Sequence, residues 1–419
     1  MDTGELDQAE APRAAPPGER LGWWAGISYG LPRPFWILLA GTFVNRIGYL
    51  VEPFLALYLV GPRGLSATTA GVVVACFGAG AFASQPLGGY LADRIGRRAT
   101  LVAGMVGSAA SFVLLAAVRD LWLIGFAALL SGVAVDIYRP AVSALVTDLV
   151  RPEHRARAFA LLYWVINLGV AVAGITGGYL AARSFWLLFL ADAFTCLAFA
   201  VLIARQVPET RPERDPTAAT GYGPVLRDRL LLGITATMLL GATVYLQSFI
   251  TLPIAVQADG LGPEAYGFIY AVNPIVVIVS QVFVLRIIDR ITGVWLLSAS
   301  LVVLGIGFGL TAFASTIPFY ALTVVIWTIG EVGFNAVGPA LVADIAPADM
   351  RGRYNGVIGT SWGAAALLAP LIGTRLLDLY GEGVLWGSCL VASVVAAVMI
   401  IAMAPAIARR RAANAALPT

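Results

Sequence analysis

Six ionisable residues lie inside long apolar stretches of the sequence, and they are the first candidates for chemistry. They are Arg46, Glu52, Asp136, Arg139, Asp192 and Glu331. A charge at membrane depth is costly unless it is paired or hydrated, so each is a candidate for a functional role. Desolvation raises the pKa of a carboxyl group and a neighbouring arginine lowers it, so a carboxylate that alternates between these surroundings takes up and releases a proton.

Glu331 fits this chemistry best, because no basic residue shares its apolar stretch. We expect it to meet Arg46 or Arg139 across a cavity, or to carry a proton; the alternative is a static buried ion pair that fixes helix packing. Asp136 and Arg139 lie three positions apart, so they could instead neutralise each other on one helix face. Glu52 and Asp192 lie toward the ends of their apolar stretches, and we expect both to be interfacial or structural.

A second polar cluster lies in the turn 88–98, between two apolar runs. Gly89 and Gly96 allow the backbone to turn sharply and allow two helices to approach closely. Asp93 lies beside three basic residues where a membrane helix would leave the hydrocarbon: Arg94, Arg97 and Arg98. This turn could therefore form ion pairs with neighbouring helix ends.

The composition defines the environment of both clusters. The 419 residues are 59% hydrophobic and 12% charged, with a mean hydropathy of +0.85. Soluble domains carry about 25% charged residues, so the composition predicts a multi-pass membrane protein. Cys76, Cys196 and Cys389 lie far apart and His154 is the one histidine, so we expect no disulfide framework, no metal centre and no histidine-dependent triad. A nucleotide-binding loop is also missing, and neither an enzyme nor a nucleic-acid-binding protein is expected.

Twelve apolar runs reach the length of about 20 residues that a spanning helix needs. They lie near 35–60, 70–91, 100–118, 121–146, 158–182, 186–206, 230–255, 266–287, 294–314, 318–344, 356–379 and 384–406. The sequence thus predicts an all-α integral membrane fold of two six-helix bundles. The expected parts are a tail over 1–34, bundles over 35–206 and 230–406, a linker over 207–229 and a second tail over 407–419.

Arginines are unevenly distributed between the connecting segments. They concentrate in alternate loops, near 94–98, 151–157, 205–229, 286–290, 351–353 and 409–411. Because basic residues are retained on the cytoplasmic side, we expect these loops and both termini to be cytoplasmic. No cleavable signal peptide is visible in the first 34 residues.

The two halves repeat at one offset of 196 positions. Asp93-Arg94 maps onto Asp289-Arg290, and Asp148 maps onto Asp344. The same offset takes Arg155 and Arg157 onto Arg351 and Arg353. Parallel repeats of this kind are typical of transporters with a substrate site between the halves.

The run Gly89-x-x-x-Asp93-Arg94-x-Gly96-Arg97-Arg98 resembles the signature loop of the major facilitator superfamily. The resemblance implies a secondary transporter that works by alternating access, with spans 1, 4, 7 and 10 lining a central cavity. It places one polar cluster there: Asn45, Arg46, Asp136, Arg139, Gln247, Asn273, Glu331 and Asn335. It also implies a cytoplasmic gate that includes an Arg97–Asp148 pair and consists of Gly89, Asp93, Arg94, Gly96, Arg97, Asp148, Asp289, Arg290 and Asp344.

Two subfamilies share further features with the chain. The overall pattern resembles drug:proton antiporters, although Ala127 stands where their helix 4 arginine is expected. Arg46, Tyr49 and Glu331 are similar to residues of proton-dependent oligopeptide symporters. These resemblances imply proton-coupled efflux of small amphipathic compounds, or alternatively proton-coupled uptake of peptide-like solutes. In either case the expected partners are a small-molecule substrate, protons and the lipid bilayer of a bacterial plasma membrane. We expect a monomer with no cofactor and the proton gradient as its energy source.

Overall fold

The computed structural model describes residues 31–209, 223–288, 293–347 and 350–415, and every regular element within them is a helix. The first half of the chain forms α2 (Arg33–Ile47), α3 (Val51–Val60), α4 (Ala67–Ile95), α5 (Arg97–Ala117), α6 (Leu121–Asp136), α7 (Tyr138–Leu149), η1 (Pro152–His154), α8 (Arg155–Arg183) and α9 (Phe185–Gln206). The second half forms α10 (Gly223–Leu226), α11 (Arg229–Tyr245), α12 (Gln247–Ile250), α13 (Leu252–Ala258), α14 (Pro263–Ile288), α15 (Gly293–Leu310), η2 (Thr311–Phe313), α16 (Ile317–Ile345) and α17 (Arg351–Ala415).

The described residues contain eleven segments that are long and apolar enough to cross a membrane. The last of them, Arg353–Asn414, has 62 residues and is interrupted at Gly381, whose φ of 79° and ψ of 178° are not helical. A helix of that length would measure about 90 Å, three times the hydrocarbon thickness, so this segment is two spans. The twelve predicted spans are therefore present. Most of the predicted N-terminal tail and residues 210–222 of the predicted linker lie outside the described residues, and the domain boundaries stay a prediction.

Three spans are broken near their middle, and each break comes shortly before a proline. The first span is α2 and α3, the fourth is α6 and α7, and the seventh is α11 to α13. Pro53, Pro140 and Pro253 occupy the second or third position of the segment after the break. Proline has no N–H and its ring clashes with the carbonyl four residues earlier, but it fits the first turn of a new helix.

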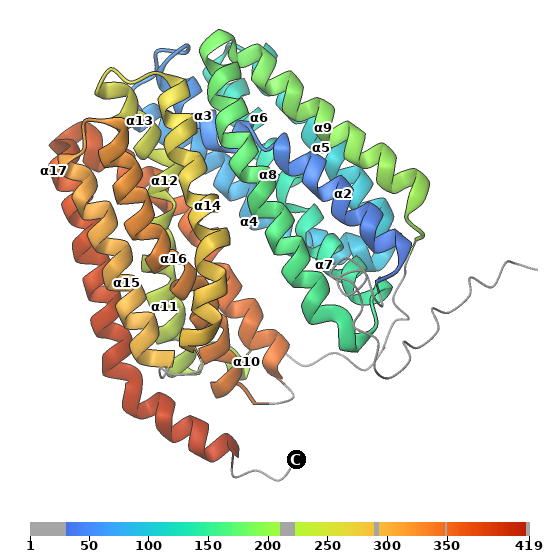
Figure 1. The fold of residues 1–419 in the computed structure, drawn as a ribbon, viewed down its shortest axis with the longest axis vertical. Helices are drawn as coiled ribbons and strands as arrows, with labels where there is room; N and C mark the ends of the chain where they lie inside the picture. The colour runs from blue at the N-terminus through green and yellow to red at the C-terminus, as the bar shows by residue number, and fades with distance from the viewer. Residues whose placement is uncertain (1–30, 210–222, 289–292, 348–349, 416–419) are drawn as a thin grey trace, which may run out of the picture.

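The two halves form two bundles that pack against each other through glycines (Figure 1). A Cβ atom at Gly267 on α14 would lie 2.3 Å from the carbonyl oxygen of Gly174 on α8. One at Gly78 on α4 would lie 2.1 Å from the carbonyl oxygen of Ala366 on α17. The backbones of the halves are thus in direct contact at both places, which only residues without side chains permit.

These contacts lie toward one end of the molecule. Thr68, in the first turn of α4, donates its N–H and its hydroxyl to Asp378 Oδ2 on α17 at 2.6 and 2.5 Å. The arginine-rich loops lie at the other end, which we call the arginine-rich end. Figure 1 shows α8 and α14 adjoining at the end with Gly178 and Pro263 and diverging toward the arginine-rich end. The halves are therefore closed together at the end opposite the arginines.

We expect Gly267→Ala to disfavour this closed arrangement, because its methyl group would overlap the Gly174 carbonyl. The matched control is Gly262→Ala, since a Cβ there meets nothing within 4 Å. Labelling of a cysteine introduced at the buried Ala271, in a cysteine-free background, should be faster in Gly267→Ala than in Gly262→Ala. Equal labelling of the two variants would show that this glycine contact does not control closure.

Candidate functional site

Glu331 on α16 is the centre of a buried polar cluster in the second half. Its side chain is 6% exposed. Asn273 on α14 donates to Oε2 at 2.5 Å, Asn335 donates to Oε1 at 3.4 Å, and the Tyr245 hydroxyl also hydrogen-bonds the carboxylate. The Asn273 amide additionally donates to Thr328 Oγ1 at 2.9 Å. The expected contacts of Glu331 with Asn273 and Asn335 are thus present.

Aromatic rings surround this carboxylate. The Tyr245 ring makes edge contacts with Trp327, Trp362 and Phe249 at centroid distances of 5.9, 5.7 and 5.7 Å. Tyr163, on α8 of the first half, lies near enough to interact electrostatically with Glu331. The cluster therefore combines one acidic group with an aromatic wall, next to the boundary between the halves.

Asn45 and Arg46 make their described side-chain contacts with residues of the first half. The Asn45 amide donates to Met105 Sδ at 3.6 Å and to Cys196 Sγ at 3.5 Å. The Arg46 guanidinium lies over the rings of Tyr49 and Tyr138, 5.0 and 5.1 Å from their centroids. Asn45 thus faces sulfur atoms of the first half instead of Glu331, whereas Tyr270 on α14 interacts electrostatically with both Arg46 and Glu331, so the single cluster stays a prediction. The orientation of Asn45 arises because α2 packs on α8 and α9, which turns its side chain toward the interior of the first half.

The expected pairing of Glu331 with an arginine is also not found among the described side chains. The hydrogen bonds to its carboxylate come from Asn273, Asn335 and Tyr245, all in the second half. Asp136 ends α6 and is half-buried, while the side chain of Arg139 lies outside the described residues, so their pairing stays a prediction.

Gln247 was expected to line the cavity, but its side chain is used to hold two helices together. Its amide donates to the carbonyl oxygens of Thr243 and Ala369 at 3.2 and 3.1 Å, and Oε1 accepts from the Thr251 hydroxyl at 2.9 Å. These bonds connect the broken seventh span to α17. Gln247 thus satisfies backbone groups near the break instead of contacting Glu331.

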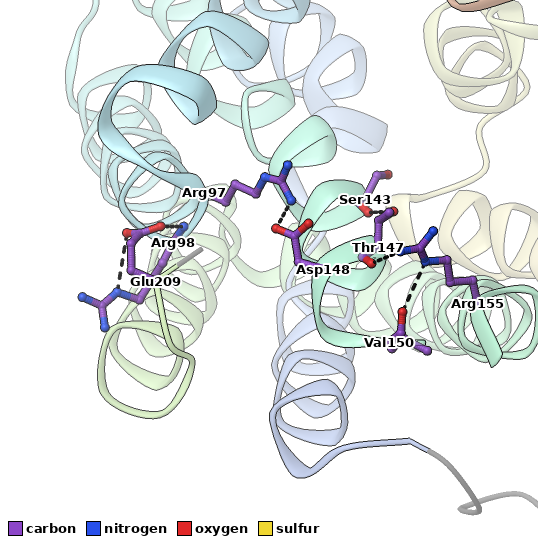
Figure 2. Close-up of polar contacts among 8 residues, drawn as sticks. All are labelled: Arg97, Arg98, Ser143, Thr147, Asp148, Val150, Arg155 and Glu209. Atoms are coloured by element: carbon purple, nitrogen blue, oxygen red, sulfur yellow. Dashed lines mark hydrogen bonds and ion pairs between the residues drawn. The ribbon is translucent and has the colours of Figure 1, made fainter. Parts of the chain in front are cut away.

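At the arginine-rich end, the expected ion pair between Arg97 and Asp148 is present (Figure 2). Arg97 begins α5 and Asp148 lies in the last turn of α7, so the pair connects two helices of the first half. It does not bridge the two halves. The surroundings of Gly89, the side chain of Asp93, and the whole of Asp289 and Arg290 lie outside what the structure describes. The gate role of this set stays a prediction.

Gly96 and Arg94 also lie at the arginine-rich end. Gly96 has a φ of 103°, which favours glycine, and forms the turn between α4 and α5. Glu209 accepts a hydrogen bond from the backbone N–H of Arg98 at 2.9 Å (Figure 2). It accepts another from the backbone N–H of Ala99 at 3.0 Å. Arg94 donates to the Tyr90 hydroxyl one turn earlier. Glu209 was not predicted from the sequence, although Gly96 offers α5 no side-chain cap and so leaves those N–H groups for another residue.

Comparison with known proteins decides the family. The profile of the Major Facilitator Superfamily matches residues 37–293 and 237–418. The chain belongs to the Major Facilitator Superfamily.

Relatives in the superfamily cover most of the chain. The MFS-type transporter YqjV of Bacillus subtilis is 26% identical over 359 residues, which are 83% of this chain and 87% of YqjV. The Na(+), Li(+), K(+)/H(+) antiporter of Planococcus maritimus is 24% identical over 80% of this chain and 87% of its own. The multidrug resistance protein MdtH of Escherichia coli is 25% identical over 82% of this chain and 86% of its own.

Among solved structures, the peptide transporter POT in complex with sulfate superposes with a TM-score of 0.75. It covers 91% of this chain and 96% of its own, at 18% identity, which shows the shared fold. This superfamily member is thus a multi-pass membrane transporter, and its relatives are transporters, not enzymes.

In the second half of the transporter, a different arginine pairs with the aspartate at the arginine-rich end. The offset of 196 places Gly293 where the first half has Arg97, so Asp344 lacks the equivalent partner. Arg411, near the C-terminal end of α17, pairs with Asp344 instead, with a Nε–Oδ2 distance of 2.9 Å. Asn414 donates to the Asp344 carbonyl oxygen at 3.0 Å. The C-terminal helix therefore replaces the missing arginine.

A second ion pair, between Asp228 and Arg410, lies beside the Asp344–Arg411 pair. We call these four residues the C-terminal clasp. Asp228 caps α11 by accepting from the backbone N–H of Leu230, and Tyr354 donates its hydroxyl to Oδ2 at 2.6 Å. Arg410 lies 3.3 Å from the same oxygen. Burial acts to raise the pKa of Asp228, but these hydrogen bonds and the arginine charge outweigh it, so the pKa lies below its ordinary value.

The Arg97–Asp148 pair provides a first test of the arginine-rich end. Arg97→Gln and Asp148→Asn should each remove up to about 1 kcal/mol, because the pair is partly exposed. If the pair contributes to gating, this loss changes the conformational equilibrium, and the transport rate in proteoliposomes, by about fivefold. Exchanging the two charges (Arg97→Asp with Asp148→Arg) should restore most of the rate. If the single variants are as active as the natural protein, the Arg97–Asp148 pair is not part of the gate.

The lowered pKa of Asp228 predicts a pH-dependent stability. A depressed carboxyl pKa contributes stability above the unfolded value of about 3.9, and this contribution is lost as the pH falls through the folded value. The melting temperature of purified protein should therefore fall between pH 6 and pH 3.5, and Asp228→Asn should lower it at pH 6 and weaken this dependence. Asp120→Asn is the matched control, because Asp120 also caps a helix, by accepting from the backbone N–H groups of Trp122 and Leu123. A pH dependence unchanged by Asp228→Asn would contradict the assignment.

Proposed function

We propose that this transporter exports small amphipathic compounds, organic cations in particular, in exchange for protons. The observation that carries the proposal is the environment of Glu331. Its carboxylate is 6% exposed, and its hydrogen-bond partners are two amides and a tyrosine hydroxyl. These neutral donors solvate a negative charge but do not cancel it. A proton or a positively charged substrate does.

Exchange would follow from competition between a proton and a cationic substrate for the Glu331 carboxylate. A buried carboxylate without a charged partner is costly, so it is neutralised by one of the two cations that can reach it. When the substrate leaves, a proton replaces it, and when the proton leaves, the site accepts substrate again. Because Glu331 lies next to the boundary of the halves, alternating access would expose it to each side of the membrane in turn.

The aromatic wall supports an amphipathic cation as the substrate. Trp327 and Trp362 both contact the ring of Tyr245, whose hydroxyl hydrogen-bonds Glu331. Aromatic faces attract cations within about 6 Å and bury the apolar parts of a ligand. The names of two relatives agree with this proposal: MdtH is a multidrug resistance protein, and the Planococcus protein is a cation/proton antiporter.

The proposed setting is the plasma membrane of a bacterium, with the arginine-rich end and both termini in the cytoplasm, as the distribution of arginines favours. The state described here would then be closed on the outer side. We propose a monomer that uses the proton gradient and no cofactor.

A second candidate is proton-coupled uptake of peptide-like solutes. The electrostatic interaction of Arg46 with Tyr270 on α14 favours it, because an arginine near the boundary could bind a carboxylate. The fold shared with the peptide transporter POT is compatible with it but shows no substrate.

The experiment uses purified protein in liposomes that contain a pH-sensitive dye. Addition of ethidium or tetraphenylphosphonium should move protons in the direction opposite to the cation. Glu331→Gln should abolish this exchange, because it removes the group that binds proton and substrate in turn. Glu153→Gln, which makes the same chemical change at an exposed residue of η1, should leave it unaffected.

Two other results would contradict the proposal. Protons that move in the same direction as dipeptides, with no response to the organic cations, would establish the second candidate. Cation exchange that survives in Glu331→Gln would show that another carboxylate carries the proton.

A further inference from the structure

The break in the first membrane span leaves two backbone N–H groups without helical partners. The helix α2 ends at Ile47, and Pro53 is the third residue of α3. The Arg46 carbonyl oxygen already accepts from the N–H of Tyr49 at 3.2 Å, in a tighter turn than an α-helix has. Leu50 and Val51 therefore begin a new helix, and their N–H groups point out of it.

These two N–H groups are deeply buried. Leu50 is 2% exposed and Val51 is fully buried, so water does not reach them. Leu50 is the N-cap residue of α3, and an aliphatic side chain cannot cap a helix. An N–H group buried without a partner is costly in any protein and more so within a membrane.

Asp192 on α9 supplies the missing acceptor from the other side of the first half. Its Oδ2 accepts from the N–H of Leu50 at 3.0 Å and from that of Val51 at 2.9 Å. Asp192 is 3% exposed. One carboxylate oxygen, 142 positions away in the chain, thus occupies the place of an N-cap side chain.

The other oxygen of Asp192 is also held. The Cys196 thiol, one turn along α9, donates to Oδ1 at 3.7 Å, and the Asn45 amide donates to the same sulfur at 3.5 Å. Thr195 fixes the register of α9 on the break, because a Cβ at Gly48 would lie 1.7 Å from Thr195 Oγ1. Residues on both sides of the break therefore contact one short stretch of α9.

The break determines where Tyr49 and Arg46 lie. Tyr49 stands between the two helical segments, and its ring lies under the Arg46 guanidinium. Arg46, Tyr49, Glu52 and Asp192 line the same pocket. In a continuous helix the residues before and after position 49 would be rotated differently, and this set would not converge.

We propose that Asp192 is a positioning residue for transport: by capping α3 across the first half, it fixes the break in the first span and thereby the placement of Arg46 and Tyr49. The role follows from an acceptor oxygen at this position and not from its negative charge. The transport measurement in the test of this inference rests on the proposed function, whereas the hydrogen-exchange measurement does not.

The test compares variants that keep the acceptor with variants that remove it. Asp192→Asn retains an oxygen that can accept from both N–H groups. Asp192→Leu removes it, and Asp192→Ser, which is polar but too short, serves if the leucine variant does not fold. Amide hydrogen exchange of the full-length protein in nanodiscs is measured over residues 48–55, and ethidium/proton exchange is measured in proteoliposomes.

The acceptor-free variants should exchange Leu50 and Val51 at least about tenfold faster than the natural protein, since a buried hydrogen bond is lost. Their KM for ethidium should rise by about tenfold with a smaller change in maximal rate, because binding geometry is altered. Asp192→Asn should stay close to the natural protein in both measurements. A purely structural role would lower the amount of folded protein and leave the KM of the folded fraction unchanged.

Three results would overturn the inference. They are unchanged exchange in the acceptor-free variants, an unchanged KM despite faster exchange, and an Asp192→Asn variant that behaves like Asp192→Leu. If the natural protein moves no ethidium, the proposed function fails separately, and hydrogen exchange over residues 48–55 still decides whether Asp192 holds the break.

Discussion

Every backbone N–H and carbonyl group of a chain in hydrocarbon must find its partner within the protein, and this constraint explains most of the polar contacts described here. Prolines and sharp turns release such groups, and side chains from distant helices bind them. Asp192 does this for α3, and Gln247 does it for the seventh span. These residues are polar because the backbone requires it, which leaves Glu331 as a buried carboxylate whose partners are side chains alone.

Close contact between the halves depends on a second feature, the glycines at which the backbones of the two bundles meet. Gly174 and Gly267 allow backbone contact between α8 and α14, and Gly78 allows it between α4 and α17. Side chains also pack across this boundary, because the Phe54 ring makes an edge contact with the Tyr266 ring at a centroid distance of 5.2 Å. Thr68 and Asp378 add a polar contact between the halves at the end opposite the arginines.

The sequence predicted the twelve spans, because hydrophobic length is a property of consecutive residues. It also predicted contacts that a repeated loop encodes, such as Arg97 with Asp148, and near neighbours such as Glu331 with Asn335. It did not predict that Asn45 faces Cys196, since the rotation of α2 depends on packing against α9. The cap formed by Asp192 was missed for the same reason: the break at Pro53 is visible in the sequence, but the acceptor lies 142 positions away. Prolines alone are also insufficient, because Pro86 and Pro274 lie inside uninterrupted helices.

The C-terminal clasp has a consequence for the lipids around this protein. Arg410 and Arg411 hold the end of α17 against the second half through Asp228 and Asp344. Anionic head groups attract the same guanidinium groups with about 1 kcal/mol for each arginine near the surface, which is comparable to a partly exposed ion pair. Anionic lipids in an adjacent leaflet would thus compete with the two aspartates for these arginines. The anchoring of this helix would then depend on the membrane composition as well as on the chain.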